Sequence, residues 1–257
     1  MPIIQLPHTD LFYAPHLPPD AQQTLLLIHG AGGSHLTWPA ELRRLPQTAV
    51  YALDLAGHGR SALPGHKTII DYAQDIVDFI EALALENVVL LGHSMGGAIV
   101  QQVALAPPPT VTGLILVGTG AKLRASPQIL AAVEDDLATA VDFLNQFLWG
   151  HHPTEAAIAV NRRTMLACSA EVMLGDFVAC NQFDLREQLA AITLPTLVIS
   201  SQLDQMTPAK FGEFLAAQLP QGQFALIEDA GHMLMLEAPT AVAQLVETFL
   251  RGIRGEN

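Results

Sequence analysis

The chain has 257 residues, of which half are hydrophobic and only 14% are charged, so a disordered chain and a coiled coil are both excluded. A formal charge of −13, with only 12 lysines and arginines, argues against a nucleic-acid partner and makes a strongly anionic substrate less expected. There is no apolar run of about 18 residues and no basic segment followed by an apolar one at the N-terminus. We therefore expect a cytoplasmic protein without membrane segments.

The first 120 residues alternate between predicted strands and helices. Residues 1–20 are rich in proline and contribute at most short edge strands. Continuous apolar runs predict strands that are buried on both faces, at 24–28, 49–55, 88–91 and 111–117. Helical patterns lie between them, near 38–45 and 71–85 and after residue 94. This order is typical of a parallel sheet with helices on both faces.

The alternation stops after residue 120. Ser126-Pro127 is a helix start, and apolar residues then recur every three or four positions up to Gly150. Two further helical stretches follow near 154–167 and 170–180, and the alternation then resumes with elements at 196–200, 208–218, 224–227 and 239–250. We therefore expect a core of residues 1–120 and 191–257, with a helical cap of residues 121–190 inserted after the sixth strand.

One pentapeptide, Gly92-His93-Ser94-Met95-Gly96, lies between a predicted strand and a predicted helix. A serine on such a tight turn projects its hydroxyl beyond the sheet edge, and the flanking glycines permit a strained backbone. Free N–H groups at the start of the helix would face whatever the serine attacks. The pattern predicts a nucleophile at Ser94, and a plain surface serine on a strand-to-helix turn is the alternative.

Nucleophilic catalysis also requires a base and an acid that orients the base. His232 follows the last predicted strand, which places it at the carboxyl edge of a parallel sheet, where ligand sites occur. Asp204 follows the strand before it and gives the chain order serine, acid, histidine. Glu228 and Asp229 are competing acids, but they share the short loop of His232 and are expected to point away from its ring.

Together these motifs resemble the α/β-hydrolase superfamily over nearly the whole chain, and in particular its serine carboxylesterase-like members. The resemblance is carried by His29-Gly30, residues 54–59, Gly92–Gly97, Asp204 and Gly231-His232. It implies the α/β-hydrolase fold and a catalytic triad of Ser94, Asp204 and His232.

The same resemblance implies an oxyanion hole made by the backbone N–H groups of Ala31 and Met95. It also implies structural roles for His29 and His58, whose ring nitrogens would bond loop backbone. Ser201 stands where relatives often have glycine, and Leu55-Ala56-Gly57 departs from the commoner turn sequences. Neither departure touches the chemistry, but both affect the shape of a loop.

No metal or cofactor is expected. Cys168 and Cys180 are the only cysteines and are expected to be free thiols, and no Cys/His spacing typical of zinc occurs. The glycine-rich loop after residue 29 lacks the ending of a phosphate-binding loop. Adjacent His151 and His152 would point in different directions on a helix, so a metal site there is not expected.

A serine at position 94 excludes the aspartate-nucleophile members of the superfamily, the dehalogenases and epoxide hydrolases. We expect the substrate pocket to be lined by His35, Trp38, Leu123, Phe143, Phe147, Trp149, Met206 and Met233, with simple packing between helices as the alternative for the aromatic residues of the cap. This set is apolar and carries no positive charge suited to a carboxylate or phosphate. A small neutral ester therefore fits best, cleaved by a carboxylesterase that is a monomer or a homodimer.

Two alternatives stay open at this stage. The same triad could hydrolyse lactones, enol-lactones or the activated carbon–carbon bonds of vinylogous diketones. A ligand receptor on the same scaffold, with slow residual hydrolysis, is a different class of answer. A complete triad favours an enzyme.

Overall fold

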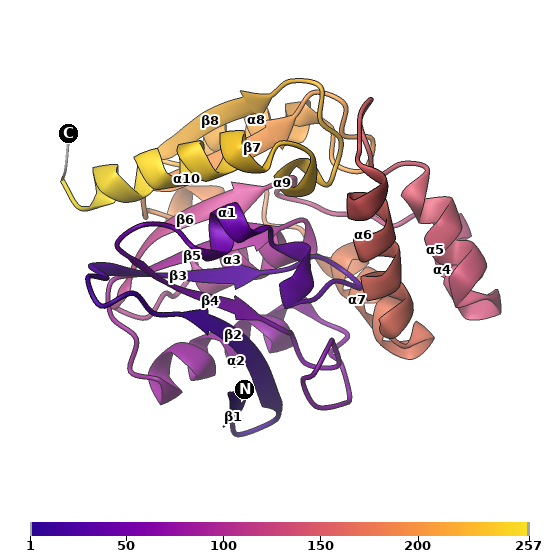
Figure 1. The fold of residues 1–257 in the computed structure, drawn as a ribbon, viewed down its shortest axis with the longest axis horizontal. Helices are drawn as coiled ribbons and strands as arrows, with labels where there is room; N and C mark the ends of the chain where they lie inside the picture. The colour runs from indigo at the N-terminus through magenta and orange to yellow at the C-terminus, as the bar shows by residue number, and fades with distance from the viewer. Residues whose placement is uncertain (1, 256–257) are drawn as a thin grey trace.

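The computed structural model describes residues 2–255 and contains one mixed eight-stranded sheet (Figure 1). The strand order is β1-β2-β4-β3-β5-β6-β7-β8, with β1 and β2 antiparallel to their neighbours and every other pair parallel. The strands are β1 (Ile3–Gln5), β2 (Asp10–His16), β3 (Gln23–Ile28), β4 (Thr48–Leu53), β5 (Val88–His93), β6 (Val111–Val117), β7 (Thr196–Ser201) and β8 (Gly222–Ile227). The expected α/β sheet is confirmed, and the proline-rich start supplies the two antiparallel strands at one side of it, with β1 at the edge.

Two apolar layers cover the two faces of the sheet. Along β3, Leu26 and Ile28 face one layer while Leu25 and Leu27 face the other, because successive side chains in a strand point to opposite faces. The first layer includes residues of α2 (Ile69–Ala82), α3 (Met95–Val103) and α8 (Ala209–Gln218). The second includes residues of α1 (Ala40–Arg43), α9 (Leu234–Glu237) and α10 (Pro239–Ile253). Burial on both faces explains why the central strands are continuously apolar.

Four helices separate β6 from β7 in the chain. They are α4 (Pro127–Asp135), α5 (Leu137–Asn145), α6 (Glu155–Ala167) and α7 (Ala170–Gln182), and the arrowheads of the parallel strands point toward them (Figure 1). The single helical run expected up to Gly150 is broken at Asp136. This residue leaves helical geometry, at φ −152° and ψ 109°, and its carboxylate accepts hydrogen bonds from the N–H groups of Ala138 and Thr139. Asp136 therefore ends one helix and caps the next.

The fold also contains two short 3-10 helices. They are His35–Thr37, between β3 and α1, and Leu189–Ala191, between α7 and β7. Among the helices of residues 2–255, none is both long enough and apolar enough to cross a bilayer.

Candidate active site

Ser94 lies on a strained turn between β5 and α3. Its backbone has φ 52° and ψ −115°, a region that costs a non-glycine residue free energy. Close packing on both sides enforces the turn, because a Cβ at Gly92 would meet the backbone of Gly96, and one at Gly96 would meet the carbonyl of Ile28. Thr119 Oγ1 donates a 2.8 Å hydrogen bond to the Ser94 carbonyl and braces the turn from β6. The nucleophile candidate is thus held by backbone packing at the carboxyl edge of the sheet.

His232 and Asp204 meet beside this turn. His232 Nδ1 lies 2.8 Å from Asp204 Oδ2, and both side chains are buried. Burial opposes ionisation of Asp204, but the charge of His232 and its hydrogen bond outweigh burial and lower the pKa of the carboxyl. Because a carboxylate can only accept, His232 Nδ1 donates the proton of this hydrogen bond, and Nε2 is the nitrogen that can act as a base.

The Asp204 carboxylate is fully engaged on its own loop. Oδ1 accepts hydrogen bonds of 2.8 Å from the N–H groups of Met206 and Thr207, and Thr207 Oγ1 donates to Oδ2 at 2.8 Å. The competing acids Glu228 and Asp229 are exposed, and among residues 2–255 neither bonds the His232 ring. The structure therefore brings Asp204, and not its competitors, to the histidine.

Another acidic residue, Glu237, holds the His232 loop in place, and the sequence analysis did not identify it. Its carboxylate accepts hydrogen bonds from Gly231 N–H at 2.9 Å and from Gly150 N–H at 2.7 Å. Burial raises the pKa of Glu237. This carboxylate joins the loop of His232 to Gly150, in the segment between α5 and α6 of the helical insertion. Gly150 and Glu237 are far apart in the chain, so no local pattern predicts the contact.

His93 packs directly against the base. Its ring centroid lies 4.7 Å from that of His232, and its Nε2–H donates a 2.9 Å hydrogen bond to the His232 carbonyl. Burial, followed by the charge of His232, lowers the pKa of His93 to about 3. His93 is therefore neutral, and it supports the backbone of the base.

The loop after β3 is fixed by histidines and by one buried carboxylate. His29 Nδ1–H donates to the Gly30 carbonyl at 2.8 Å, and Nε2 accepts from Leu55 N–H at 3.1 Å. Burial, followed by the charge of His58, lowers the pKa of His29 to about 4, so the neutral form bonds both loops. The expected backbone bonds of His29 are confirmed. Within residues 2–255, neither the N–H of Ala31 on this loop nor that of Met95 donates a hydrogen bond.

Asp176 of α7 reaches this loop from the insertion. It is fully buried and accepts hydrogen bonds from Gly32 N–H at 2.9 Å, from Tyr72 Oη–H at 2.7 Å and from His58 Nε2 at 2.8 Å. Burial opposes charge on His58, but Asp176 outweighs it and raises the pKa of His58 well above its ordinary value. His58 also bonds the Ala56 carbonyl at 3.0 Å, so it bonds loop backbone as expected and in addition forms a buried ion pair.

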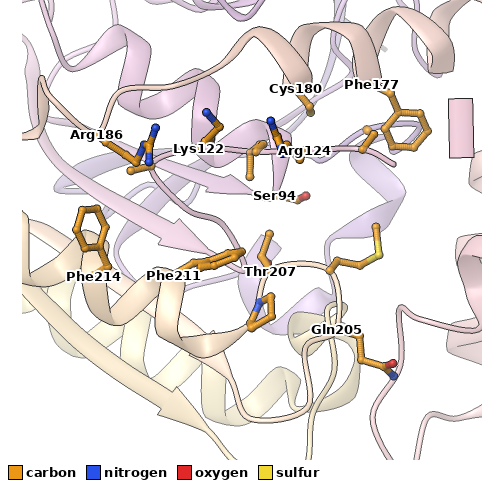
Figure 2. Close-up of a pocket in the computed structure, with 16 residues that line it drawn as sticks. Ser94, Lys122, Arg124, Phe177, Cys180, Arg186, Gln205, Thr207, Phe211 and Phe214 are labelled. Carbon is orange, nitrogen blue, oxygen red and sulfur yellow. The ribbon is translucent and has the colours of Figure 1, made fainter. Parts of the chain in front are cut away.

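Two cavities meet at Ser94. A small cavity of about 60 Å³ is bordered by Gly30, Ala31, Ser94 and His232 together with residues of the insertion. A larger cavity of about 650 Å³ is also bordered by Ala31 and Ser94 and extends between the insertion and α8 (Figure 2). Among residues 2–255 no hydrogen bond joins Ser94 Oγ to His232. Such bonds often form only when a substrate is bound.

Three of the eight expected pocket residues border these cavities: Leu123, Met206 and Met233. The others lie elsewhere, each for its own reason. His35 is held by Asp54, with its Nδ1 2.8 Å from Oδ1 and its backbone N–H 2.6 Å from the same oxygen. Trp38 is only 1% exposed and packs inside the second apolar layer.

The three aromatic residues of α5 and its end also lie outside the two cavities. Phe143 is 37% exposed and packs edge-to-face on Phe147 with ring centroids 5.1 Å apart. The indole N–H of Trp149 donates to Asn145 Oδ1 at 3.1 Å, and its ring packs among buried residues. From this part of the insertion, Leu144 and Leu148 border the small cavity instead. Helical spacing alone cannot tell which apolar residues of an amphipathic helix face a cavity and which face a neighbouring helix.

The larger cavity is not free of positive charge. Lys122, Arg124 and Arg186 border it together with Phe177, Phe211 and Phe214 (Figure 2). The expectation of walls without positive charge was wrong, because it considered only apolar candidates. Lys122 and Arg124 lie in the segment that begins after the end of β6 at Val117, so the rule that placed Asp204 at the sheet edge could have found them. Arg186 follows α7 and has no such local signal.

Among residues 2–255, no cluster of three or more histidine, cysteine or acidic side chains has the geometry to hold a metal ion. Cys168 and Cys180 are buried free thiols.

Comparison with known proteins agrees with this architecture. The model of the alpha/beta hydrolase family matches residues 25–245, which is more than half of the chain. A pimeloyl-[acyl-carrier protein] methyl ester esterase of Yersinia pseudotuberculosis is 29% identical over 241 residues, covering 88% of this chain and 92% of that protein. The enzyme of the same name from Serratia marcescens is 28% identical over 249 residues, covering 90% of this chain and 95% of that protein.

Solved structures share the fold along almost the whole chain. A hydrolase from Pseudomonas aeruginosa PA01 superposes with a TM-score of 0.87 at 28% identity, covering 97% of each chain. An esterase from Exiguobacterium antarcticum superposes with a TM-score of 0.90 at 20% identity, covering 97% of this chain and 98% of that one, a likeness of fold alone. The family match, the sheet order and the turn at Ser94 lead to one conclusion: the chain belongs to the alpha/beta hydrolase family.

Proposed function

We propose that the protein is a serine carboxylesterase that cleaves carboxylic esters through an acyl-enzyme intermediate. One observation carries the proposal: Ser94 and His232 border the same small cavity, and His232 Nδ1 is bonded to Asp204 at 2.8 Å. The printed names of the curated relatives, which are methyl ester esterases, support ester hydrolysis.

In this mechanism Ser94 Oγ attacks the ester carbonyl while His232 Nε2 takes its proton. The negative charge of Asp204 stabilises the imidazolium that forms, and the proton then passes to the leaving alcohol. Water attacks the acyl-enzyme in the second half of the reaction, with His232 as the base again. The backbone N–H groups of Ala31 and Met95 would stabilise the oxyanion, since both are free to donate among the described residues.

We further propose that residues 121–190 act as a cap over the core formed by residues 1–120 and 191–257. The larger cavity supports this division, because Leu123, Phe177 and Cys180 border it from the insertion while Ser94 and Met206 border it from the core. A substrate would therefore lie between the two parts, in a cavity that both of them border.

A substrate panel with matched variants tests the proposal. The panel contains methyl and p-nitrophenyl esters of short acids, a γ-lactone and a vinylogous diketone. We expect ester turnover to lead, and S94A and H232A each to lower kcat by at least about 10³. The S94A/H232A double variant should be hardly slower than either single variant, because the two groups act as a unit. Turnover of the lactone or diketone above that of every ester, or undiminished turnover by S94A, would contradict the assignment.

A further inference from the structure

We propose that the larger cavity contains a subsite for an anionic group, a carboxylate or phosphate at the end of the substrate distant from the scissile ester, formed by Lys122, Arg124 and Arg186. The inference rests on the proposed ester hydrolysis, and it adds the substrate class that this site would select. We infer it from three observations: the positions of these three cations, the ion pairs that two of them form, and the side chains around them.

The charge of this cavity opposes that of the chain. The sequence has 12 lysines and arginines against 25 acidic residues. Nevertheless, three of the 12 are among the 16 residues that border this cavity, where a proportional share would be less than one. Within the described residues, no aspartate or glutamate borders the cavity. A cavity of positive potential in an acidic protein attracts anions and disfavours cations.

Two of the three cations, Lys122 and Arg186, are paired with the carboxylate of Asp184. Arg186 bonds Asp184 through Nε at 2.8 Å and Nη2 at 2.7 Å, and Lys122 Nζ lies 2.7 Å from Asp184 Oδ2. The two chain segments form an antiparallel bridge at residues 122 and 184. The bidentate contact of Arg186 and the bond of Lys122 lower the pKa of Asp184. The three groups therefore keep one positive charge in a defined position.

Arg124 supplies a second positive charge. Within residues 2–255 its guanidinium has neither an ion pair nor a hydrogen bond, although Ala125 N–H next to it is anchored to Asn181 Oδ1 at 2.9 Å. A guanidinium presents five N–H donors in a planar fork that matches a carboxylate or phosphate. This group is therefore the one best able to accept a new anionic partner without breaking an existing pair.

The remaining walls determine what connects the anion to the ester. Figure 2 draws the three cations along one side of the cavity and Phe211 and Phe214 along the other, with Ser94 beside them. Met206, Leu123 and Phe177 add to the apolar lining. A volume of about 650 Å³ suits a small molecule. The fitting ligand is thus an ester with a short apolar chain and a negatively charged end, such as the monoester of a dicarboxylic acid.

Matched substrates and variants test this subsite. Monomethyl esters of straight-chain dicarboxylic acids are compared with methyl esters of monocarboxylic acids of equal length, and a third series ends in a phosphate monoester. The readout is the ratio of kcat/KM for the anionic ester to that for the neutral ester. We expect a ratio above one in the wild type, about three- to tenfold lower in R124Q and lower still in R124E. The substrate series whose ratio falls more in R124Q and R124E shows whether carboxylate or phosphate is the preferred group.

R162E is the matched control. Arg162 lies on α6 of the same insertion, has a side chain that is 43% exposed, pairs with Asp142 and does not border this cavity. R162E changes the net charge by the same amount as R124E, but at a residue outside the lining of the subsite. We therefore expect its ratio to stay within about twofold of the wild-type ratio. A ratio that moves less than twofold in R124E, or equally in R162E, would overturn the subsite. The proposed function is tested separately. Cleavage of the neutral ester by S94A would contradict the proposed function, whereas an unchanged ratio in R124E would contradict only the subsite.

Discussion

The backbone N–H of Gly32 donates a 2.9 Å hydrogen bond to the carboxylate of Asp176, which lies on α7 of the helical insertion. Gly32 follows Ala31, the residue that we propose as an oxyanion donor. The same carboxylate is paired with His58 at 2.8 Å and bonded by Tyr72. The insertion is therefore tied, through one buried charge, to the loop on which we expect the oxyanion to bind.

Replacing Asp176 with asparagine should destabilise the protein and lower its kcat for ester hydrolysis. The variant leaves the protonated His58 without its buried partner, and removing one member of a buried pair costs about 3–5 kcal/mol. Displacement of the loop should lower kcat by up to about 10² while the protein is still folded. Urea unfolding and steady-state kinetics at low temperature measure both effects.

Asp142 is the control for that experiment. It lies on α5 of the same insertion, is exposed and pairs with Arg162. Because solvent screens the pair, D142N should leave both the unfolding midpoint and kcat essentially unchanged. If D142N and D176N behaved alike, the buried network would not connect the insertion to the site.

The acid of the proposed triad is tested by Asp204→Asn. The asparagine amide would favour the wrong tautomer of His232, so kcat should fall by about 10⁴ with little change in fold. D229N is the matched control, because Asp229 lies on the His232 loop, is exposed and has φ 57°, a conformation that asparagine tolerates. Comparable losses in kcat for D204N and D229N would refute the assignment of Asp204.

Stability should fall as the pH is lowered below neutrality. Burial holds the pKa of His29 at about 4 and that of His93 at about 3, whereas the unfolded chain titrates near 6.5. Between these values the unfolded state binds more protons than the folded state, so the neutral histidines stabilise the fold above pH 6.5 and lose that contribution as the pH falls. By pH 5 the loss is roughly 2 kcal/mol for each histidine.

Urea unfolding from pH 7 to pH 5 measures this dependence. H93Q removes one of the two groups, so the slope of unfolding free energy against pH should decrease by up to one proton. The midpoint at pH 7 should also fall, because the bond to the His232 carbonyl is lost. An unchanged slope in H93Q would mean that His93 is not the source of the proton uptake.

The strands and the nucleophile turn could be predicted from local sequence because each depends on neighbouring residues, and the family could be predicted from the order of several such local motifs along the chain. Continuous apolar runs indicate buried parallel strands, and Gly92 and Gly96 mark a turn that side chains would block. The break at Asp136 was missed, although aspartate is a preferred N-cap residue, because the apolar periodicity continues through it.

The contacts that tie the site together were beyond sequence reasoning. Asp176, Glu237 and Asp184 each bond residues that are distant in the chain, and no local pattern distinguishes them from surface acids. Pocket walls such as Trp38 and Phe143 were misplaced because spacing gives a face of a helix but not its neighbour. Tertiary packing decides these positions.

The most direct test of Ser94 as the nucleophile is the position of a covalent label. A fluorophosphonate reacts with an activated serine, and digestion followed by mass spectrometry locates the adduct. We expect one adduct on Ser94 in the folded wild type, with matching loss of ester turnover, and very slow labelling in H232A. An adduct on another residue, or full inactivation while Ser94 remains unmodified, would contradict the assignment of Ser94.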